Sequence, residues 1–387
     1  MRANCEPPPL LRLAQTPLSP RLSRMFRLEN FVPRGRSPSL AALAGAALTL
    51  AGCASPRVGI EAGSAEAASL TRFEFTQPQM GVPFRIVLYA PDAAAASNAA
   101  RVAFVRIAAL NRVMSDYEDD SELTLLSRTA GSGRAVKLSD DLWRVLEAGQ
   151  EFARRSDGTF DVTVGPVVQL WRRARRQHEL PDPARLAAAM QAVGWRNLIL
   201  YRRDHTAKLT VRGMRLDLGG IAKGYATDEA LKILRAHGIT RALVSGGGDM
   251  AAGDPPPGAR GWRIEVAPLD VTNAPPRTFV LLTHGGLATS GDIFQHVELE
   301  GRRYSHIVDP RIGVGLTDHS LVTVLAPDGM TADALSTAVS VLGPKRGLKL
   351  VEATPHAAVH IARMPGEQLE VLKSRRFPDW ERAASDR

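Results

Sequence analysis

A paired-glycine turn between a strand-like lead-in and a helical pattern is the feature that most constrains the fold. Residues 216–224 read Leu-Asp-Leu-Gly-Gly-Ile-Ala-Lys-Gly, with an apolar run at 209–216 before them and helical periodicity at 225–236 after them. A glycine turn that opens a helix presents free backbone N–H groups and a positive dipole end to an anion. Lys223 adds a point charge suited to phosphate, and Asp217 can hold a polar ligand edge or a metal. A strand-to-helix turn whose glycines only permit the backbone path explains the same residues.

A second run has an unusual helix face. Residues 332–342 have helical periodicity, and Asp333 and Thr337 are four residues apart, so they share one face of that helix. Ser336 and Ser340 widen this face, where a solvent-facing helix would usually carry Lys, Glu or Arg. A carboxylate beside a hydroxyl suits a hard cation such as Mg²⁺. Helix capping, with Asp333 facing the helix dipole, is the alternative interpretation.

The remaining pattern predicts an α+β fold in one globular unit, with mainly antiparallel sheets, packed helices and two intimately associated halves. Strands and helices do not alternate strictly, and no clean linker divides the body. The expected strands are 71–76, 83–89, 198–202, 208–211, 215–218, 241–245, 262–267, 278–283, 295–299 and 320–325. The expected helices are 94–114, 140–156, 185–193, 225–236 and 332–342, the last ending at Gly343-Pro344.

The N-terminal part reads as an export signal over residues 1–52. Seven arginines against two glutamates before residue 40 give it a net charge of +5, which leaves +4 of the total +9 for the rest of the chain. An uncharged apolar run at 40–50 follows, too short to span a bilayer, and small residues precede Cys53. A start at Met25 would give a signal of ordinary length, so residues 1–24 are either upstream of the real start or an extended n-region.

Leu50-Ala51-Gly52-Cys53 resembles a bacterial lipobox, which implies that Cys53 is lipidated and begins the mature chain. An ordinary signal peptide with a chance cysteine is the alternative. Residues 53–70 are then a lipidated cysteine and a flexible tether, 71–370 the folded domain and 371–387 a C-terminal tail. Cys5 and Cys53 are the only cysteines, so the folded domain is expected to contain no disulfide.

Charge does not indicate a nucleic-acid partner. The basic cluster at 172–176 has no aromatic or glycine interleaving beyond Trp171, so we interpret it as a solvated helix face. The chain also lacks a zinc-type His/Cys cluster, a P-loop, a nucleophile elbow and a Rossmann glycine motif.

Several ordered segments together resemble one family. They are Met80-Gly81, the stretch 114–117 with 121–123, 157–161, 217–224, Gly247-Gly248-Asp249, 289–291, 306–310 and 333–337. In this order they resemble the flavin transferases of the ApbE type, the FAD:protein FMN transferases, over about residues 72–365. Each segment alone is weak, and the ordered combination is specific.

The resemblance implies a T-fold-like architecture and a reaction. FAD is cleaved at its pyrophosphate, and FMN is joined through a phosphoester to a Ser or Thr hydroxyl of an acceptor protein, with release of AMP. Mg²⁺ would be held by Asp333, Thr337 and a backbone carbonyl of the glycine turn, that of Ala222. His306 and Asp217 are the catalytic candidates, His306 for activating the hydroxyl or steadying the phosphates.

The residues that would bind FAD by this resemblance are Met80, Tyr117, Thr159, Phe160, Asp161, Asp217, Lys223 and Ile307. From its own sequence context, Phe160 is more in keeping with a core residue, and Tyr117 with either ring stacking or capping of the core. The chain departs from the family pattern at Ile312, where a Thr is frequent, and at Val162, where a Pro is common.

The resemblance also implies a lipid-anchored protein of the cell envelope, on the periplasmic face of the inner membrane. The acceptor would be a subunit of a membrane redox complex or an exported reductase. A periplasmic FAD-binding lipoprotein or FAD pyrophosphatase, which gives FMN and AMP without a protein acceptor, is the alternative. A non-catalytic lipoprotein is a third hypothesis, which the Asp333, Thr337 and Lys223 set disfavours.

Overall fold

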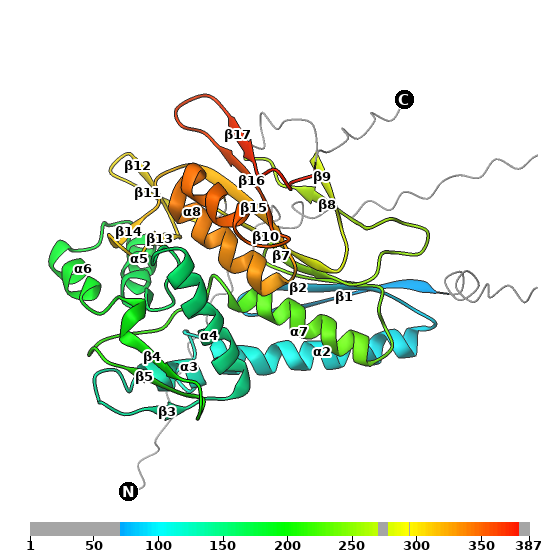
Figure 1. Ribbon diagram of the computed structural model, residues 1–387, viewed down its shortest axis with the longest axis horizontal. Helices are drawn as coiled ribbons and strands as arrows, with labels where there is room; N and C mark the ends of the chain where they lie inside the picture. The colour runs from blue at the N-terminus through cyan, green and yellow to red at the C-terminus, as the bar shows by residue number, and fades with distance from the viewer. Residues whose placement is uncertain (1–69, 270–277, 294, 379–387) are drawn as a thin grey trace, which may run out of the picture.

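An eight-stranded antiparallel sheet forms the centre of the computed structural model, which describes residues 70–269, 278–293 and 295–378 (Figure 1). The strand order is β1-β2-β6-β7-β10-β15-β16-β17. The strands are β1 (Thr71–Gln79), β2 (Val82–Ala90), β6 (Ala242–Gly246), β7 (Asp249–Ala252), β10 (Gly285–Gly291), β15 (Ser320–Ala326), β16 (Ala358–Arg363) and β17 (Glu370–Lys373).

Three long helices cover one face of this sheet: α2 (Ala93–Met114), α7 (Ala222–Ala236) and α8 (Gly329–Glu352) (Figure 1). Their apolar sides join Phe84, Ile86 and Leu88 of β2 in the main core. Within the described residues, α2 is the helix long and apolar enough to cross a membrane. Its buried side chains belong to the main core, as expected of a core helix.

The opposite face of the sheet is covered by the hairpin β8 (Trp262–Val266) and β9 (Thr278–Leu282). Val87 of β2 packs here with Trp262 and Val280, whereas its neighbours Ile86 and Leu88 face the helices. This alternation is the period-two pattern of a strand buried on both sides.

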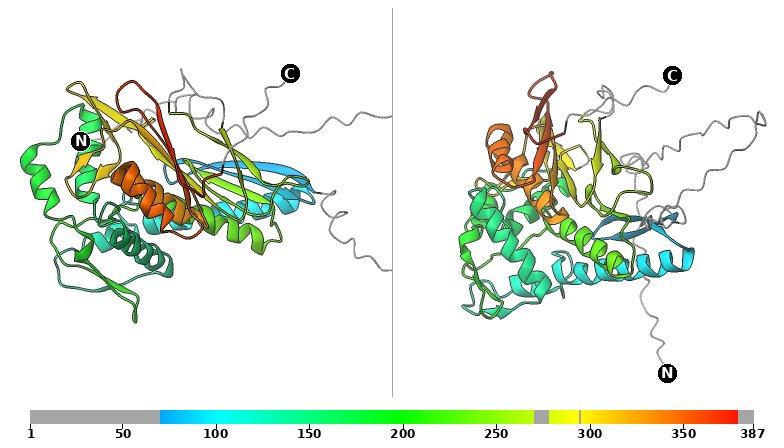
Figure 2. Two further views of the ribbon diagram at one scale, coloured as in Figure 1. Left: turned by 45° about the horizontal axis from the view of Figure 1, so that its top comes forward. Right: turned by 45° about the vertical axis from the view of Figure 1, so that its right-hand side comes forward.

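A helical lobe lies at one end of the sheet (Figure 2). It consists of α3 (Glu122–Ser127), α4 (Asp140–Arg155), α5 (Gly165–Gln177), α6 (Pro183–Met190), a 3₁₀ turn (Trp195–Asn197) and the small sheet β3 (Val136–Lys137), β5 (Thr206–Leu209) and β4 (Leu198–Tyr201). Two short hairpins follow β10 in the chain: β11 (His296–Leu299) with β12 (Arg302–Ser305), and β13 (Val308–Asp309) with β14 (Val314–Gly315).

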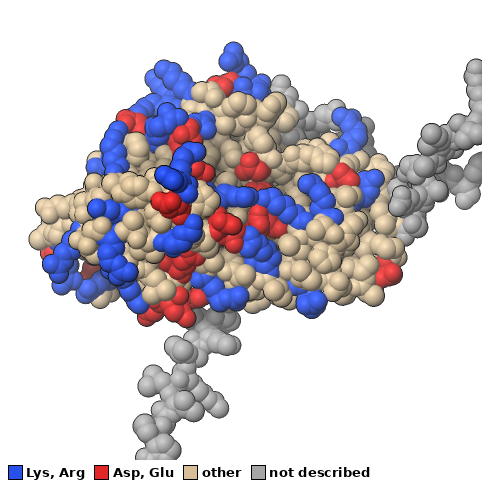
Figure 3. Space-filling view, turned by 60° about the horizontal axis from the view of Figure 1, so that its bottom comes forward, with Lys and Arg blue, Asp and Glu red and all other residues tan. Residues whose placement is uncertain are grey.

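Ion pairs join the helices across their outer faces. Arg106 of α2 donates to Asp141 of α4 at 2.5 Å and to Glu229 of α7 at 2.6 Å. On the face shown in Figure 3, Lys and Arg side chains are interspersed with Asp and Glu. This face therefore presents mixed charge instead of one continuous basic stripe.

The fold class predicted from the sequence is confirmed. Two adjacent antiparallel strands followed by a long helix occur twice, as β1–β2 with α2 and as β10–β15 with α8, which agrees with two associated halves. The helices expected at 94–114 and 225–236 are α2 and α7. The signal peptide, Cys53 and the tether to residue 69 lie outside the described residues.

The end of a helix expected at Gly343-Pro344 agrees with the structure: Gly343 has a non-helical backbone with φ 72° and ψ 174°, and a further helical segment of α8 follows it to Glu352. Two other expectations about boundaries were wrong. Residues 215–218 do not form a ladder strand, because Arg215 makes only an isolated bridge with Val164. The boundary at residue 371 falls inside β17, whose residues pair with β16, so the folded body continues beyond it.

Candidate active site

The glycine turn and helix α8 are in direct contact. Oδ2 of Asp333 accepts a hydrogen bond from the backbone N–H of Gly224 at 3.1 Å. A Cβ on Gly220 would lie 2.8 Å from Oγ1 of Thr337, so only glycine fits there without moving Thr337. Ala222 lies between these two contacts at the start of α7. The turn and the polar face of α8 therefore lie side by side, as a shared site would require.

The polar face of α8 is buried against β10, which explains why it lacks long charged side chains. Oγ of Ser336 lies 2.8 Å from Oγ of Ser290, and it donates to the carbonyl of Asp333 at 2.9 Å. Asp333 is 2% exposed and Ser336 is fully buried. Short hydroxyl side chains satisfy each other at this close contact, where Lys or Glu would not fit.

Lys223 lies between two buried carboxylates. Its Nζ is 2.7 Å from Oδ2 of Asp249 and 3.7 Å from Oδ2 of Asp333. Burial raises the pKa of Asp249 to about 7, the charge of Asp333 adds to this, and the ammonium of Lys223 opposes it. Burial likewise raises the pKa of Asp333. When both carboxylates are ionised, two carboxylates and one ammonium give this buried cluster a net negative charge.

The hairpin turns bring two further segments to this end of the sheet. Met80 and Gly81 connect β1 to β2 with φ of 50° and 76°, the left-handed values of a two-residue hairpin turn. Gly247 and Gly248 connect β6 to β7 directly before Asp249. A Cβ on Gly247 would lie 3.1 Å from Val82, so the two turns are neighbours and Met80 lies close to the Asp249 strand.

A second polar cluster surrounds Asp217. Its Oδ1 accepts from the N–H of Gly219 at 2.8 Å, and its Oδ2 accepts from Arg172 at 2.8 Å. Arg172 also donates to Asp116 and places its guanidinium 4.3 Å from the ring centre of Tyr117. Because both oxygens of Asp217 are engaged, its carboxylate has a positioning role in this arrangement rather than that of a free base.

The interpretation of residues 172–176 as a fully solvated face was wrong at its first residue. The side chain of Arg172 is 18% exposed and lies between two carboxylates that come from other segments. Helix α5 begins with Gly165-Pro166, and its turn spacing directs Arg172 inward while Arg173 stays exposed. Tyr117 is 76% exposed, so the face of its ring away from Arg172 is free to stack on a ligand.

Residues 159–161 are internal. Oδ1 of Asp161 accepts from Thr163 N and Oγ1, and its Oδ2 accepts from Trp195 N at 2.8 Å. Phe160 is 4% exposed and packs edge-on against Phe152. Thr159 donates its hydroxyl to the carbonyl of Ser156. These three side chains are buried, and each contacts groups inside the protein.

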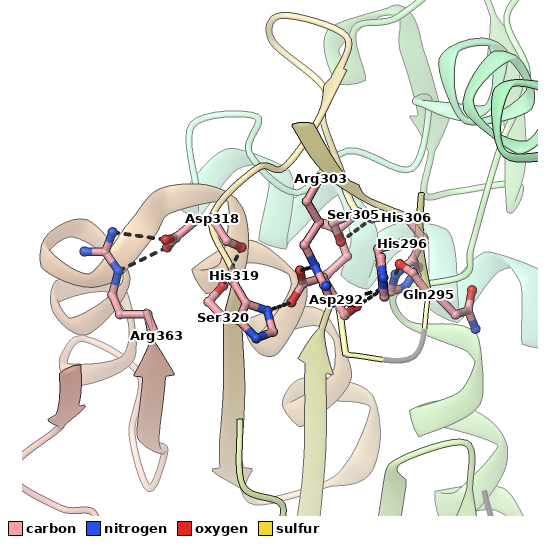
Figure 4. A network of polar contacts seen from close by, with 11 residues as sticks. Asp292, Gln295, His296, Arg303, Ser305, His306, Asp318, His319, Ser320 and Arg363 are labelled. Carbon is pink, nitrogen blue, oxygen red and sulfur yellow. Dashed lines mark hydrogen bonds and ion pairs between the residues drawn. The ribbon is translucent and has the colours of Figure 1, made fainter. Parts of the chain in front are cut away.

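His306 follows β12 and is held by one carbonyl (Figure 4). The oxygen of Gln295 lies 2.9 Å from the backbone N and 3.1 Å from Nδ1 of His306. The ring is exposed on one side, while the protein around it lowers its pKa to about 4. Desolvation is the main cause, and the charges of Arg175 and Lys223 act in the same direction. Ile307 beside it is buried.

Residues 80–361 of the chain match the model of the ApbE family. The chain belongs to the ApbE family. An FAD:protein FMN transferase of Treponema pallidum is 33% identical over 313 residues, which cover 77% of this chain and 85% of that protein. One from Haemophilus influenzae is 32% identical over 260 residues, covering 66% of this chain and 75% of that protein.

Solved ApbE structures share the fold. The flavin transferase ApbE of Vibrio cholerae superposes with a TM-score of 0.71 at 26% identity, over 79% of this chain and 98% of that one. The apo flavinyl transferase ApbE of Pseudomonas stutzeri superposes with a TM-score of 0.70 at 29% identity, over 79% and 95% of the two chains.

The donor set of this ApbE-family site fits a hard cation. In the part of the chain that the structure describes, no three His, Cys, Asp or Glu side chains converge as metal ligands. The cluster instead offers carboxylate, hydroxyl and carbonyl oxygens, the ligands that Mg²⁺ prefers. Oδ2 of Asp249 is buried, and among the described residues its close partner is the ammonium of Lys223 at 2.7 Å. A cation near Asp333 would relieve this excess of buried negative charge.

Sequence reasoning gave no role to Asp249, Arg172 or Asp116. Asp249 belongs to one of the segments that resemble the family. Its position directly after two glycines of a hairpin turn is the sequence feature that could have marked it as a site residue. Arg172 lay in a cluster of five positions with four arginines. Only the helix direction of α5 distinguishes it from the exposed members.

Proposed function

We propose that this protein transfers the FMN part of FAD to a hydroxyl group of an acceptor protein. The observation that carries this proposal is the buried Lys223–Asp249–Asp333 cluster against the glycine turn, an oxygen-rich and charged site able to hold a cation and a pyrophosphate together. The names of the relatives, FAD:protein FMN transferases, support the same reaction.

In this proposal Asp333, Thr337 and the carbonyl of Ala222 hold Mg²⁺. Bound there, the cation would polarise the pyrophosphate and neutralise charge on the leaving phosphate. The positive end of α7 would attract the phosphates, while the N–H groups of Gly219 and Gly224 are already donated to Asp217 and Asp333. Lys223 supplies a further fixed positive charge, and Asp249 keeps that ammonium in place.

The transfer makes one P–O bond and breaks another. The oxygen of an acceptor Ser or Thr attacks the phosphorus of the FMN half, and the pyrophosphate P–O bond breaks, with AMP leaving. Because the carbonyl of Gln295 can only accept, His306 donates from Nδ1, and its Nε2 carries a free lone pair. Nε2 is therefore the atom that takes the hydroxyl proton.

The planar ring of FAD would stack on the exposed face of Tyr117. Met80, in the β1–β2 turn, would lie beside the phosphates of FAD. Ile307 would pack next to His306 and support its position. Asp217 would contribute indirectly, by positioning Arg172 and Gly219. Residues 159–161 would contact FAD through their backbone.

One assay tests the reaction. The folded domain is incubated with FAD, Mg²⁺ and a flavin-acceptor domain, and both in-gel flavin fluorescence and AMP release are measured. Labelled acceptor with AMP is expected. AMP without labelled protein would instead establish FAD pyrophosphatase activity, and no AMP would refute both enzymes. Asp333→Ala should abolish turnover if Asp333 binds the cation.

We also propose that the protein is exported and anchored through a lipid on Cys53, on the periplasmic face of the inner membrane. The support is the arginine-rich leader, the short apolar run and the Leu-Ala-Gly-Cys sequence. Metabolic labelling with a radioactive fatty acid should label the full chain but not Cys53→Ser, and labelling of both would refute the anchor.

A further inference from the structure

A buried aspartate outside the matched glycine turn and helix face is the centre of a dense polar network. Asp292 directly follows β10, and its side chain is 3% exposed. Its Oδ1 accepts from Nδ1 of His319 at 2.8 Å, and its Oδ2 accepts from Nε of Arg303. Its backbone carbonyl lies 2.9 Å from Nη2 of Arg303 and 2.7 Å from Nδ1 of His296. Figure 4 shows these side chains converging on Asp292.

Two of these partners of Asp292, His296 and Arg303, lie on the two strands of the hairpin that leads to His306, whereas His319 directly precedes β15. His296 begins β11, and Arg303 is on β12. The two strands pair with His296 opposite Ser305, which places Gln295 opposite His306. Asp292 thus ties both strands to the end of β10, whose Ser290 contacts helix α8 beside Asp333.

The orientation of the His306 ring depends on this hairpin. The Gln295 carbonyl receives both the backbone N–H and the ring Nδ1–H of His306, so a change in the register or tilt of β11 moves the acceptor. Without that acceptor the imidazole is free to change tautomer or to turn, and Nε2 no longer carries the lone pair at a fixed place.

We propose that Asp292 is a positioning residue for His306: its carboxylate fixes Arg303 on β12, its backbone carbonyl fixes His296 on β11, and together these contacts hold the Gln295 carbonyl that sets the tautomer and direction of the imidazole. The expected loss of kcat rests on the proposed function, but the expected change in the tautomer of His306 can be measured without turnover. Arg175 and Lys223 are the cations that face His306, and Asp292 is the facing carboxylate.

The test compares Asp292→Asn with Asp318→Asn in the folded domain. Asn keeps the size of the side chain and the backbone carbonyl that contacts His296, but it removes the charge and one acceptor, so it tests the contacts of the carboxylate with Arg303 and His319. Asp318 lies in the same region and its carboxylate pairs with Arg363 of β16 at 3.1 Å, so its variant is the control for loss of a carboxylate there. For each variant, kcat with saturating FAD and acceptor, the Kd for FAD, the thermal midpoint and the nitrogen NMR shifts of His306 are measured.

Asp292→Asn should lower kcat roughly tenfold or more while the Kd for FAD changes less than about twofold, because loss of an oriented general base acts on the chemical step. Asp318→Asn should retain the wild-type kcat. In a His306→Ala background, Asp292→Asn should add no further loss, since the two residues act as one unit.

NMR separates failure of this proposal from failure of the proposed function. Wild-type His306 should be protonated at Nδ1 alone, and Asp292→Asn should give a mixture of tautomers. An unchanged tautomer, or losses that add fully to those of His306→Ala, would overturn the role of Asp292. If the wild type shows no transfer, the proposed function fails, and the tautomer shift alone decides whether Asp292 positions His306.

Discussion

The ammonium of Lys223 lies 2.7 Å from Oδ2 of Asp249, a buried carboxylate oxygen. Asp333 lies on the other side of the same ammonium. A lysine between two desolvated carboxylates has a structural role besides the ligand-binding role proposed for it, because without it the site carries two negative charges with no ammonium between them.

Lys223→Met should therefore destabilise the protein in the presence of EDTA by about 3 kcal/mol, since removing one partner of a buried ion pair leaves an uncompensated charge. Mg²⁺ should restore more stability in Lys223→Met than in the wild type, because the cation replaces the lost charge. Thermal midpoints with EDTA and with Mg²⁺ measure this. Lys232→Met is the control, since Lys232 is 55% exposed and pairs with Glu229 on the surface of the same helix.

Arg172→Ala should weaken FAD binding about tenfold, because it removes the cation behind the Tyr117 ring and leaves Asp116 and Asp217 without their shared partner. Arg172→Lys should lose less, since it keeps the charge but not the planar fork. Quenching of flavin fluorescence on binding reports the Kd. Arg173→Ala, on the exposed side of α5, is expected to bind FAD as the wild type does. Equal affinity in all three variants would contradict a role for Arg172.

Local patterns in the sequence predicted those parts of the site that lie close together in the chain. The glycine turn and the Asp333/Thr337 face each occupy a few residues, and helical geometry alone places Asp333 beside Thr337. Asp249 and Arg172 were missed as site residues because their roles depend on which strand and helix pack against the turn. That information resides in the tertiary fold.

A one-dimensional pattern gives the position of a residue and not the direction of its side chain. Phe160 and Asp161 are in a segment that resembles the family's FAD site, and in the structure their side chains contact Phe152, Thr163 and Trp195 inside the protein. The helix end at Gly343-Pro344 needed only local information, because Gly343 leaves the helical conformation directly before a proline.

Gly220→Ala should impair catalysis by displacing Thr337, because the new Cβ would lie 2.8 Å from Oγ1 of that residue. A double-mutant cycle with Thr337→Ala tests this cause. Gly220→Ala should lower kcat and raise the Mg²⁺ concentration required for half-maximal activity, yet it should have little further effect once Thr337 is alanine. Full additivity of the two losses would show that Gly220 acts through the turn itself and not through Thr337.

His360 should make the protein acid-sensitive. Burial, together with the nearby charge of Lys373, lowers the pKa of His360 to about 4, whereas an unfolded histidine has a pKa near 6.5. The folded state then binds fewer protons than the unfolded state between these values, so the stability contributed by neutral His360 is complete above pH 6.5 and is lost as the pH falls through about 4. Thermal midpoints between pH 7 and pH 4 should therefore fall less steeply for His360→Leu than for the wild type.

His178→Asn is the control for this prediction. It changes an exposed histidine with φ 54° at the end of α5, a conformation that Asn tolerates, and it should keep the wild-type slope of thermal midpoint against pH. An equal slope in His360→Leu would contradict the assignment.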